Sequence, residues 1–365
     1  MIIDADGHWF ETEDVFEKYM EPELRNYRPR LLSDEQGYNF WVVDGQTAYK
    51  RPSIKGAGAP GTAAPPGKAL QAARRASPGS QTLESLSDRL DDLDEEGIDL
   101  QFIYPSFLLH VNAWRDGLLA NAVCHAYNRR LAEVCRQAPD RLQGVGVVSL
   151  QDPGGAAEEL TRIKDLGMKS VMINGTAGAK RLDHPDHEPF FATADRLRMP
   201  VAVHFSLQFP VVDSLFEHHF PNRVFAGIMP IMAGFTSVLC SGLLDRYPNL
   251  QFAFLEGGIS WIPAHVERMD DHFANPRYGA RDLISHPPGE YLKSGRIFFG
   301  CEGNEPALGR VIDEIGEDLL MYSSDYPHAD RTERTAQFLA NREDITAPAR
   351  KKLLEDNARR FYQMQ

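Results

Sequence analysis

The sequence predicts a (β/α)₈ barrel, because short apolar runs alternate with amphipathic helical patterns along most of its 365 residues. Eight of these runs are rich in β-branched and aromatic residues, as strands are. Acids and histidines gather where several of the runs end, which is where barrel enzymes carry their active sites. The predicted strands are residues 1–6, 100–104, 144–149, 169–174, 200–204, 250–256, 296–300 and 319–324.

Helical patterns separate the predicted strands, as parallel strands with crossover helices require. Thr82 is the expected N-cap of the first helix. We expect the C-terminal helices, within residues 331–365, to pack on the barrel through an apolar face. The predicted helices are residues 82–96, 113–137, 155–166, 189–198, 231–245, 259–273, 305–315, 331–341 and 346–362.

Residues 51–81 interrupt this alternation, because they are rich in Gly, Pro and Ala and cannot form a core element. This insertion follows the first predicted strand, so on a barrel it would emerge at the face that carries the site and could form a lid. A disordered insertion without a role is the alternative. No internal repeat is apparent, and we expect a single domain over residues 1–365.

Composition restricts the class of partner. The net charge is −13, which would repel nucleic acid and anionic membrane surfaces, so a small-molecule substrate is expected. The four cysteines lack any C-x-x-C spacing, which argues against a disulfide framework and a structural zinc site. We expect no signal peptide and no apolar run of about 18 residues that would span a membrane. These features predict a cytoplasmic protein.

Candidate metal ligands stand at the ends of the predicted strands. Asp6 and His8 are two residues apart, so an extended chain places both side chains on one face. Singly, Asp6 is typical of a turn and His204 of a satisfied core histidine. A buried Glu256 would be costly without a cation or donor. Together, the set predicts a metal site at the barrel mouth, with hydrogen-bonded structural acids as the alternative. The predicted ligands are Asp6, His8, His204, Glu256 and Asp325.

Further candidates surround this set. We expect catalytic roles for Glu256, Asp325 and His328, with an orienting role toward Asp325 as the alternative for His328. The residues expected to support the ligands are Glu11, His110 and Glu302.

Four segments in this order, IIDADGHWFE, PVAVHF, FAFLEGGISWIPAHVERMDDHF and YSSDYPHAD, resemble the amidohydrolase-related family typified by aminocarboxymuconate semialdehyde decarboxylase. The resemblance implies a (β/α)₈ barrel, and its members include decarboxylases, hydrolases and hydratases. In that family an H-x-H on strand one, a His on strand five and an Asp on strand eight hold the metal, with a strand-six His beside it. The matching positions are Asp6, His8, His204, Asp325 and Glu256, so Asp6 and Glu256 replace histidines.

These two replacements bear on the metal. An oxygen-rich ligand set shifts preference from zinc toward iron or manganese, and anionic ligands stabilise the oxidation states used in dioxygen chemistry. Three carboxylates also balance most of the charge of two divalent ions, which favours a dinuclear site.

Two observations favour an apolar substrate. No obvious Arg or Lys pair stands at the strand ends, and apolar stretches lie near them, at residues 104–109, 205–209 and 229–235. Such stretches suggest an apolar pocket, although residues 229–235 are equally typical of a core helix. The wider resemblance includes a non-haem diiron monooxygenase of bacterial diterpenoid biosynthesis, of the platensimycin and platencin type.

Three hypotheses follow. The first is a two-iron, O₂-dependent monooxygenase that hydroxylates an apolar small molecule such as a terpenoid intermediate. The alternative is a hydrolase or non-oxidative decarboxylase with one Zn or Mn ion. A third is an inactive scaffold. The resemblance also implies a homo-oligomer.

Overall fold

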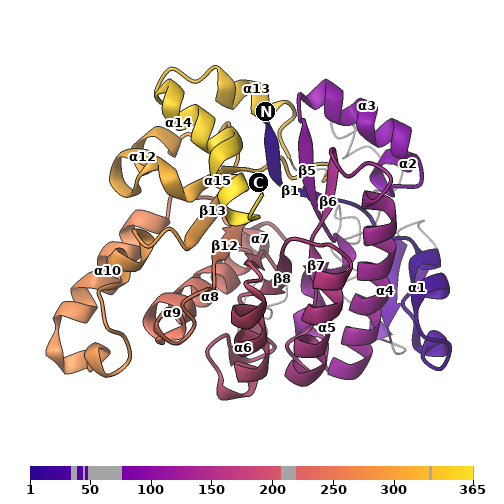
Figure 1. Ribbon diagram of the computed structural model, residues 1–365, viewed down its shortest axis with the longest axis horizontal. Coiled ribbons are helices and arrows are strands. Elements are labelled where there is room, and N and C mark those ends of the chain that lie inside the picture. Colours follow the sequence, from indigo (N-terminus) through magenta and orange to yellow (C-terminus); the bar gives the residue numbers. More distant parts are fainter. Residues whose placement is uncertain (34–38, 44–45, 48–75, 207–218, 329–330, 365) are drawn as a thin grey trace.

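The computed structural model describes residues 1–33, 39–43, 46–47, 76–206, 219–328 and 331–364. Its centre is a ring of parallel strands surrounded by helices (Figure 1). Neighbouring strands pair in sequence order, except that the third predicted strand is divided at Val145: β6 pairs with β5, and β7 pairs with β8. The strands are β1 (Ile3–His8), β5 (Leu100–Tyr104), β6 (Leu142–Gly144), β7 (Gly146–Val147), β8 (Val171–Asn174), β11 (Val201–His204), β12 (Phe252–Leu255), β13 (Ile297–Cys301) and β14 (Leu320–Tyr322).

The barrel closes where the end of β14 meets β1. The Asp325 N–H donates to the carbonyl of Asp6 at 3.0 Å, and the His8 N–H donates to the carbonyl of Tyr326 at 2.6 Å. The predicted (β/α)₈ architecture is therefore confirmed. This closure brings the two ends of the sequence together at one place on the rim.

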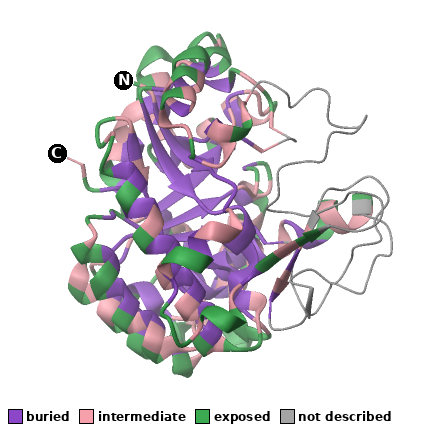
Figure 2. Cartoon of the chain, turned by 90° about the vertical axis from the view of Figure 1, so that its right-hand side faces the viewer, coloured by how far each residue is buried: buried purple, intermediate pink, exposed green. Residues whose placement is uncertain are grey.

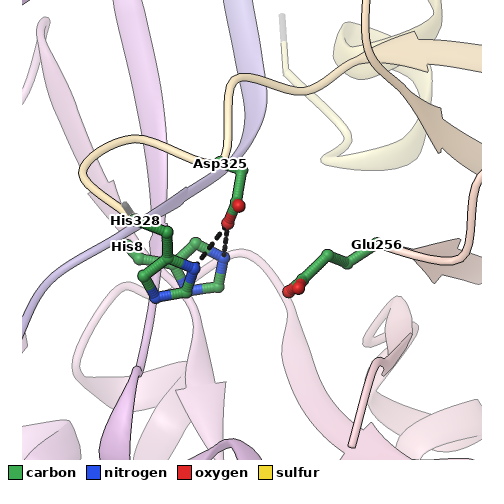
Figure 3. Close-up of side chains that lie close together, drawn as sticks. All are labelled: His8, Glu256, Asp325 and His328. Carbon is green, nitrogen blue, oxygen red and sulfur yellow. Dashed lines mark hydrogen bonds and ion pairs between the residues drawn. The ribbon is translucent and has the colours of Figure 1, made fainter. Parts of the chain in front are cut away.

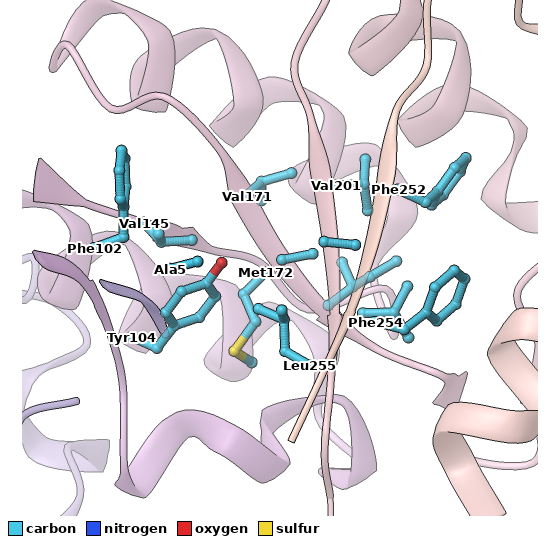
Figure 4. Packing of buried hydrophobic residues seen from close by; sticks show 14 of the residues in the cluster. Ala5, Phe102, Tyr104, Val145, Val171, Met172, Val201, Phe252, Phe254 and Leu255 are labelled. Atoms are coloured by element: carbon cyan, nitrogen blue, oxygen red, sulfur yellow. The ribbon is translucent and has the colours of Figure 1, made fainter. Parts of the chain in front are cut away.

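The outer helices carry one buried and one exposed face, whereas the strands of the barrel are almost entirely buried (Figure 2). The buried faces pack on the strands, whose apolar side chains fill the core (Figure 4). The principal outer helices are α3 (Leu86–Glu96), α4 (Gly117–Cys135), α5 (Pro153–Asp165), α6 (Glu188–Leu197), α8 (Met229–Cys240), α10 (Ile262–Ala274) and α12 (Leu308–Ile315).

The C-terminal segment contains α13 (Thr335–Ala340), α14 (Ala347–Lys351), a π-helical turn (Lys352–Asp356) and α15 (Asn357–Phe361). Tyr362, just after α15, stacks on Phe102 with ring centroids 3.4 Å apart. Its hydroxyl donates to the carbonyl of Ala5 at 2.6 Å. The end of the chain thus packs directly on the strand that carries the first predicted ligands.

Several predicted boundaries were wrong. Helix α3 begins at Leu86, capped by Ser85, while Thr82 follows the short helix α2 (Pro78–Gln81). The start predicted at residue 113 belongs to a 3₁₀ turn, Phe107–Ala113, and α4 begins only after Asp116 caps it. The helix predicted over residues 231–245 is divided into α8 and α9 (Leu243–Arg246) because Gly242 adopts a left-handed conformation, φ 76°.

A three-stranded antiparallel sheet was absent from the sequence-based prediction. It contains β2 (Arg30–Ser33), β3 (Asn39–Val43) and β4 (Gln46–Thr47), and follows helix α1 (Glu13–Tyr19). Trp41 anchors the sheet by stacking on Phe107 with centroids 4.3 Å apart. Most of the predicted lid, residues 51–75, lies outside the described residues, and residues 78–81 form α2.

One stretch of the described chain, Phe220–Cys240, is long and apolar enough to span a membrane by length and composition, contrary to the sequence-based expectation. It covers most of α7 (His219–Ala226) and all of α8, and 44% of its window is buried in the fold. Ile231, Phe235 and Leu239 are fully buried. We therefore assign α8 to the core.

Candidate metal centre

The structure brings all five predicted ligands together at the rim of the barrel. Asp6 and His8 lie in the last half of β1, His204 ends β11, and Glu256 and Asp325 follow β12 and β14. His8 Nε2 lies 3.4 Å from Asp6 Oδ1 and 3.3 Å from Asp325 Oδ1. His204 Nε2 lies 3.1 Å from the same Asp6 oxygen and 3.8 Å from Glu256 Oε2.

The backbone at two of these positions is unusual. Glu256 and Asp325 both have positive φ, 56° and 54°. Residues with a side chain adopt this left-handed region at a cost, which surrounding structure must offset, and such conformations cluster at functional sites. Glu256 directly follows β12 and Asp325 stands three residues after the end of β14, and both carboxylates point toward the site (Figure 3).

His8 directs its Nε2 atom toward two carboxylates. Its Nδ1 lies 2.7 Å from the carbonyl oxygen of Pro105, which can only accept, so Nδ1 donates. Nε2 is buried without a hydrogen-bond partner and faces Asp6 and Asp325. Glu256 Oε2 is also buried without a hydrogen-bond partner. A cation would satisfy these acceptors, and imidazole nitrogen with carboxylate oxygen is a common ligand set for divalent transition metals.

The pKa values of Asp6 and His204 show that the buried carboxylate of Asp6 is stabilised by a positive charge beside it. Burial opposes the charged form of Asp6, but the charge and hydrogen bond of His204 outweigh it and hold the pKa of Asp6 below its usual range. Burial likewise opposes protonation of His204, yet Asp6 raises the pKa of His204 to about 9. In the protein without metal, a proton on His204 supplies the charge that a metal ion would replace.

The ligand atoms form two overlapping groups. Asp6, His8 and His204 make one, and His8 with Glu256, Asp325 and His328 makes the other; the atoms of each group lie within 4.8 Å of one another. His8 belongs to both groups. The sharing of His8 places the two sets around a single region of the barrel mouth.

His328 lies between Asp325 and Ser106 and contacts each of them through one ring nitrogen. Nδ1 lies 2.6 Å from Asp325 Oδ1, and Nε2 lies 2.8 Å from the hydroxyl of Ser106. The ring also stacks on His8 with centroids 4.0 Å apart (Figure 3). This geometry corresponds to the orienting role considered for His328 in the sequence analysis.

The other predicted supporting residues lie around the site in different ways. Glu11 accepts hydrogen bonds from the backbone of Ser106, Phe107 and Leu108. Burial raises the pKa of Glu11 to about 7, although these hydrogen bonds act to lower it. Glu11 therefore organises the loop after β5.

His110 Nδ1 lies 2.9 Å from the hydroxyl of Ser206, two residues beyond the ligand His204. Burial lowers the pKa of His110 to about 3, which keeps the ring neutral. Glu302 lines the cavity beside the predicted ligands.

This cavity has a volume of about 280 Å³ and a mixed lining. Residues 229–235, expected either to line an apolar pocket or to begin a core helix, form the start of α8, where Phe235 packs on Phe254 at 5.0 Å between centroids. Residues 207–209 of another predicted apolar stretch lie outside the described residues. The cavity lining comprises Phe205, Arg223, Val224, Gly227, Ile228, Glu256, Gly257, Glu302 and Asp325.

Arg223 is the cation that sequence reasoning missed. It lies on α7, and its Nη2 is 3.3 Å from Glu256 Oε1. Its guanidinium lies over the ring of Phe205, 4.3 Å from the centroid. Burial and then the charge of Asp325 raise the pKa of Glu256 to about 7, while His204 and Arg223 act in the opposite direction. Arg223 lies on a helix, so the sequence at the strand ends gives no sign of it.

Similar proteins include decarboxylases. The chain is 28% identical over 299 residues to a gamma-resorcylate decarboxylase from Rhizobium sp., covering 77% of this chain and 88% of that protein. It is 25% identical over 278 residues to a 2-amino-3-carboxymuconate-6-semialdehyde decarboxylase from Dictyostelium discoideum, covering 75% of each.

Among solved structures, a dihydroxybenzoic acid decarboxylase from Polaromonas sp., with bound manganese and the inhibitor 2-nitroresorcinol, superposes with a TM-score of 0.72. The two chains are 21% identical, with 100% of this chain and 97% of that chain covered. This similarity supports the fold.

The decarboxylase relatives support an enzyme, and they do not support two irons or oxygenation. A family model described as Amidohydrolase matches residues 3–364, nearly the whole chain. The chain therefore belongs to the amidohydrolase family.

Proposed function

We propose that the protein is a non-oxidative decarboxylase of a small hydroxylated aromatic acid and uses one Mn²⁺ ion. The observation that carries the metal site is the buried Nε2 atom of His8, which has no hydrogen-bond partner and faces Asp6 and Asp325. The decarboxylase relatives support the reaction, and the carboxylate-rich ligands suit Mn²⁺ as well as they suit iron. Asp6, His8, His204 and Asp325 would hold the ion.

The cavity supports a small anionic substrate. A volume of about 280 Å³ suits a single-ring acid better than a terpenoid. Arg223 offers a guanidinium to the substrate carboxylate in a site that otherwise carries several acids. When bound, the metal would act as a Lewis acid that orients and polarises the oxygen atoms of the substrate.

Glu256 is the proposed proton donor, because it lines the cavity and its Oε2 atom has no hydrogen-bond partner. Its proton passes to the ring carbon that bears the carboxylate. The bond between this ring carbon and the carboxylate carbon then breaks. Its electron pair returns to the ring, and CO₂ leaves. The reaction needs no oxidant, unlike the monooxygenation expected from the sequence.

The experiment is an anaerobic assay of CO₂ release from gamma-resorcylate by the Mn²⁺-loaded protein. We expect turnover without O₂ or reductant. Glu256→Gln should bind Mn²⁺ and the acid but lose at least about 100-fold in kcat, the range for a positioned acid or base. Product formed only with O₂ and reductant, across a panel of hydroxybenzoates, would refute the proposal.

A further inference from the structure

Asp4 is a fully buried carboxylate on β1 that lies outside the set of predicted ligands. It accepts hydrogen bonds from the backbone N–H and the hydroxyl of Ser324, at 2.9 and 2.6 Å. It also accepts from Gln101 Nε2 at 2.7 Å and from the Asp6 N–H at 3.2 Å. Two of these partners adjoin the metal site, since Ser324 directly precedes Asp325 and Asp6 is itself a predicted ligand.

Gln101, on β5, connects Asp4 to a buried cation. Its Oε1 accepts from Arg89 Nε at 3.1 Å and from Arg89 Nη2 at 2.7 Å, so its amide N–H groups remain for Asp4. Arg89, fully buried on α3, also donates to the carbonyl oxygens of His8 and Ser80. A buried charge is costly unless it is compensated, and here one amide joins the carboxylate to the guanidinium.

Gly7 makes this connection sterically possible. A Cβ atom at Gly7 would lie 2.1 Å from Gln101 Nε2, so the Gln101 side chain occupies the space that any other residue would need. The pairing of β1 with β5 also shifts register between Asp4 and Gly7. The irregular part of β1, which contains Asp6, is therefore fitted around the side chain that holds Asp4.

The network lies at the seam where β1 meets the end of β14. The two backbone hydrogen bonds described above cross this seam at Asp6 and His8, and the two bonds between Asp4 and Ser324 add to them. The seam separates Asp6 and His8, on one side, from Asp325 on the other. Its geometry sets the distance between these ligands.

We propose that Asp4, held by Gln101 and Arg89, is a positioning residue that fixes the spacing between the β1 ligands and Asp325. The inference rests on the metal site of the proposed function. An amide at position 4 has one acceptor oxygen and an NH₂ group, so it cannot serve donors from both Gln101 and Ser324 as a carboxylate does. Residues that orient metal ligands typically contribute about 10- to 100-fold to metal affinity.

The test compares Mn²⁺ dissociation constants of the full chain by titration followed with electron paramagnetic resonance. Asp4→Asn should raise the dissociation constant about 10-fold or more and change the spectrum of the bound ion. The matched control is Asp99→Asn, which alters an exposed carboxylate that accepts from the Ile2 N–H at 2.6 Å beside the same strands. This control should bind Mn²⁺ as the wild type does.

Two further variants separate positioning from packing. Gln101→Ala should weaken Mn²⁺ binding, and Gly7→Ala/Gln101→Ala, which places a methyl group in the vacated space, should not restore it. Restoration in the double variant would show that filled space is sufficient and would overturn the inference.

A dissociation constant within two-fold of the wild type in folded Asp4→Asn would overturn it as well. If that variant does not fold, Ser324→Ala decides: it removes the hydroxyl bond to Asp4 and the bond that this hydroxyl accepts from the Tyr326 N–H, and it keeps the backbone bond to Asp4. A wild-type chain that binds no Mn²⁺ overturns the inference. A chain that binds Mn²⁺ but decarboxylates no aromatic acid refutes only the proposed function, since the affinity comparison does not depend on turnover.

Discussion

His328 holds Asp325 by a hydrogen bond of 2.6 Å from Nδ1 to Oδ1, while its ring stacks on His8 at 4.0 Å between centroids. One side chain thus contacts a ligand from each end of the sequence. The hydroxyl of Ser106 lies 2.8 Å from the other ring nitrogen, so the imidazole is fixed in orientation. This arrangement indicates that His328 orients the ligands.

Replacing His328 should therefore weaken metal binding. We expect His328→Ala to raise the Mn²⁺ dissociation constant about 10-fold, because Asp325 loses the donor that orients it. His328→Asn retains an N–H donor near the position of Nδ1 and should keep most of the affinity. Isothermal titration calorimetry measures both constants, and wild-type affinity in the alanine variant would exclude the orienting role.

Arg223 should determine the affinity for the substrate carboxylate. Arg223→Gln is expected to raise KM for an aromatic acid about 10-fold, which corresponds to the loss of one charge-assisted hydrogen bond. Steady-state CO₂ release gives KM and kcat separately. Arg181→Gln is the control, because Arg181 is exposed and pairs with Asp183. An unchanged KM in Arg223→Gln would mean that the substrate carboxylate binds elsewhere.

The contact between α4 and α5 should make stability depend on pH. Glu159 is buried and accepts hydrogen bonds from His125, Asn128 and Arg162. Burial raises its pKa, but these partners outweigh burial and hold the pKa of Glu159 below its ordinary value of 4.5. Because the folded value is the lower one, the carboxylate stabilises the fold above pH 4.5 and loses this effect as the pH falls through the folded value.

We therefore expect Glu159→Gln to lower the melting temperature at pH 7 and to approach the wild type as the pH decreases below about 4.5. Differential scanning fluorimetry across this range measures the change. Glu158→Gln, at the exposed neighbour, should match the wild type throughout. If the difference in melting temperature between Glu159→Gln and the wild type did not change with pH, the effect of the substitution would come from packing rather than from charge.

The strand ends could be predicted because each depends on local sequence. An apolar run followed by Asp6, His204 or Glu256 already contains the strand and its ligand, and a parallel barrel gathers such ends on one rim. The exact starts of α3 and α4 depended on which of several capping residues was used. Tertiary packing makes that choice, so local sequence alone could not.

The contacts missed by sequence are non-local. Arg223 reaches Glu256 only because of how α7 packs, and Asp4 meets Ser324 only where the barrel closes. The opening Asp-Ala-Asp-Gly-His contains both carboxylates of β1. Its pattern alone does not show that Asp6 faces the predicted metal site while Asp4 belongs to the hydrogen-bond network with Gln101 and Ser324. Homo-oligomerisation and the lid stay predictions.

The metal content of the chain tests the central claim most directly. After reconstitution without O₂, elemental analysis should give one Mn²⁺ per wild-type chain, anaerobic decarboxylation should accompany it, and Asp6→Ala and His204→Ala should lose the ion while remaining folded. Two iron ions per active chain, with turnover that consumes O₂, would contradict the account.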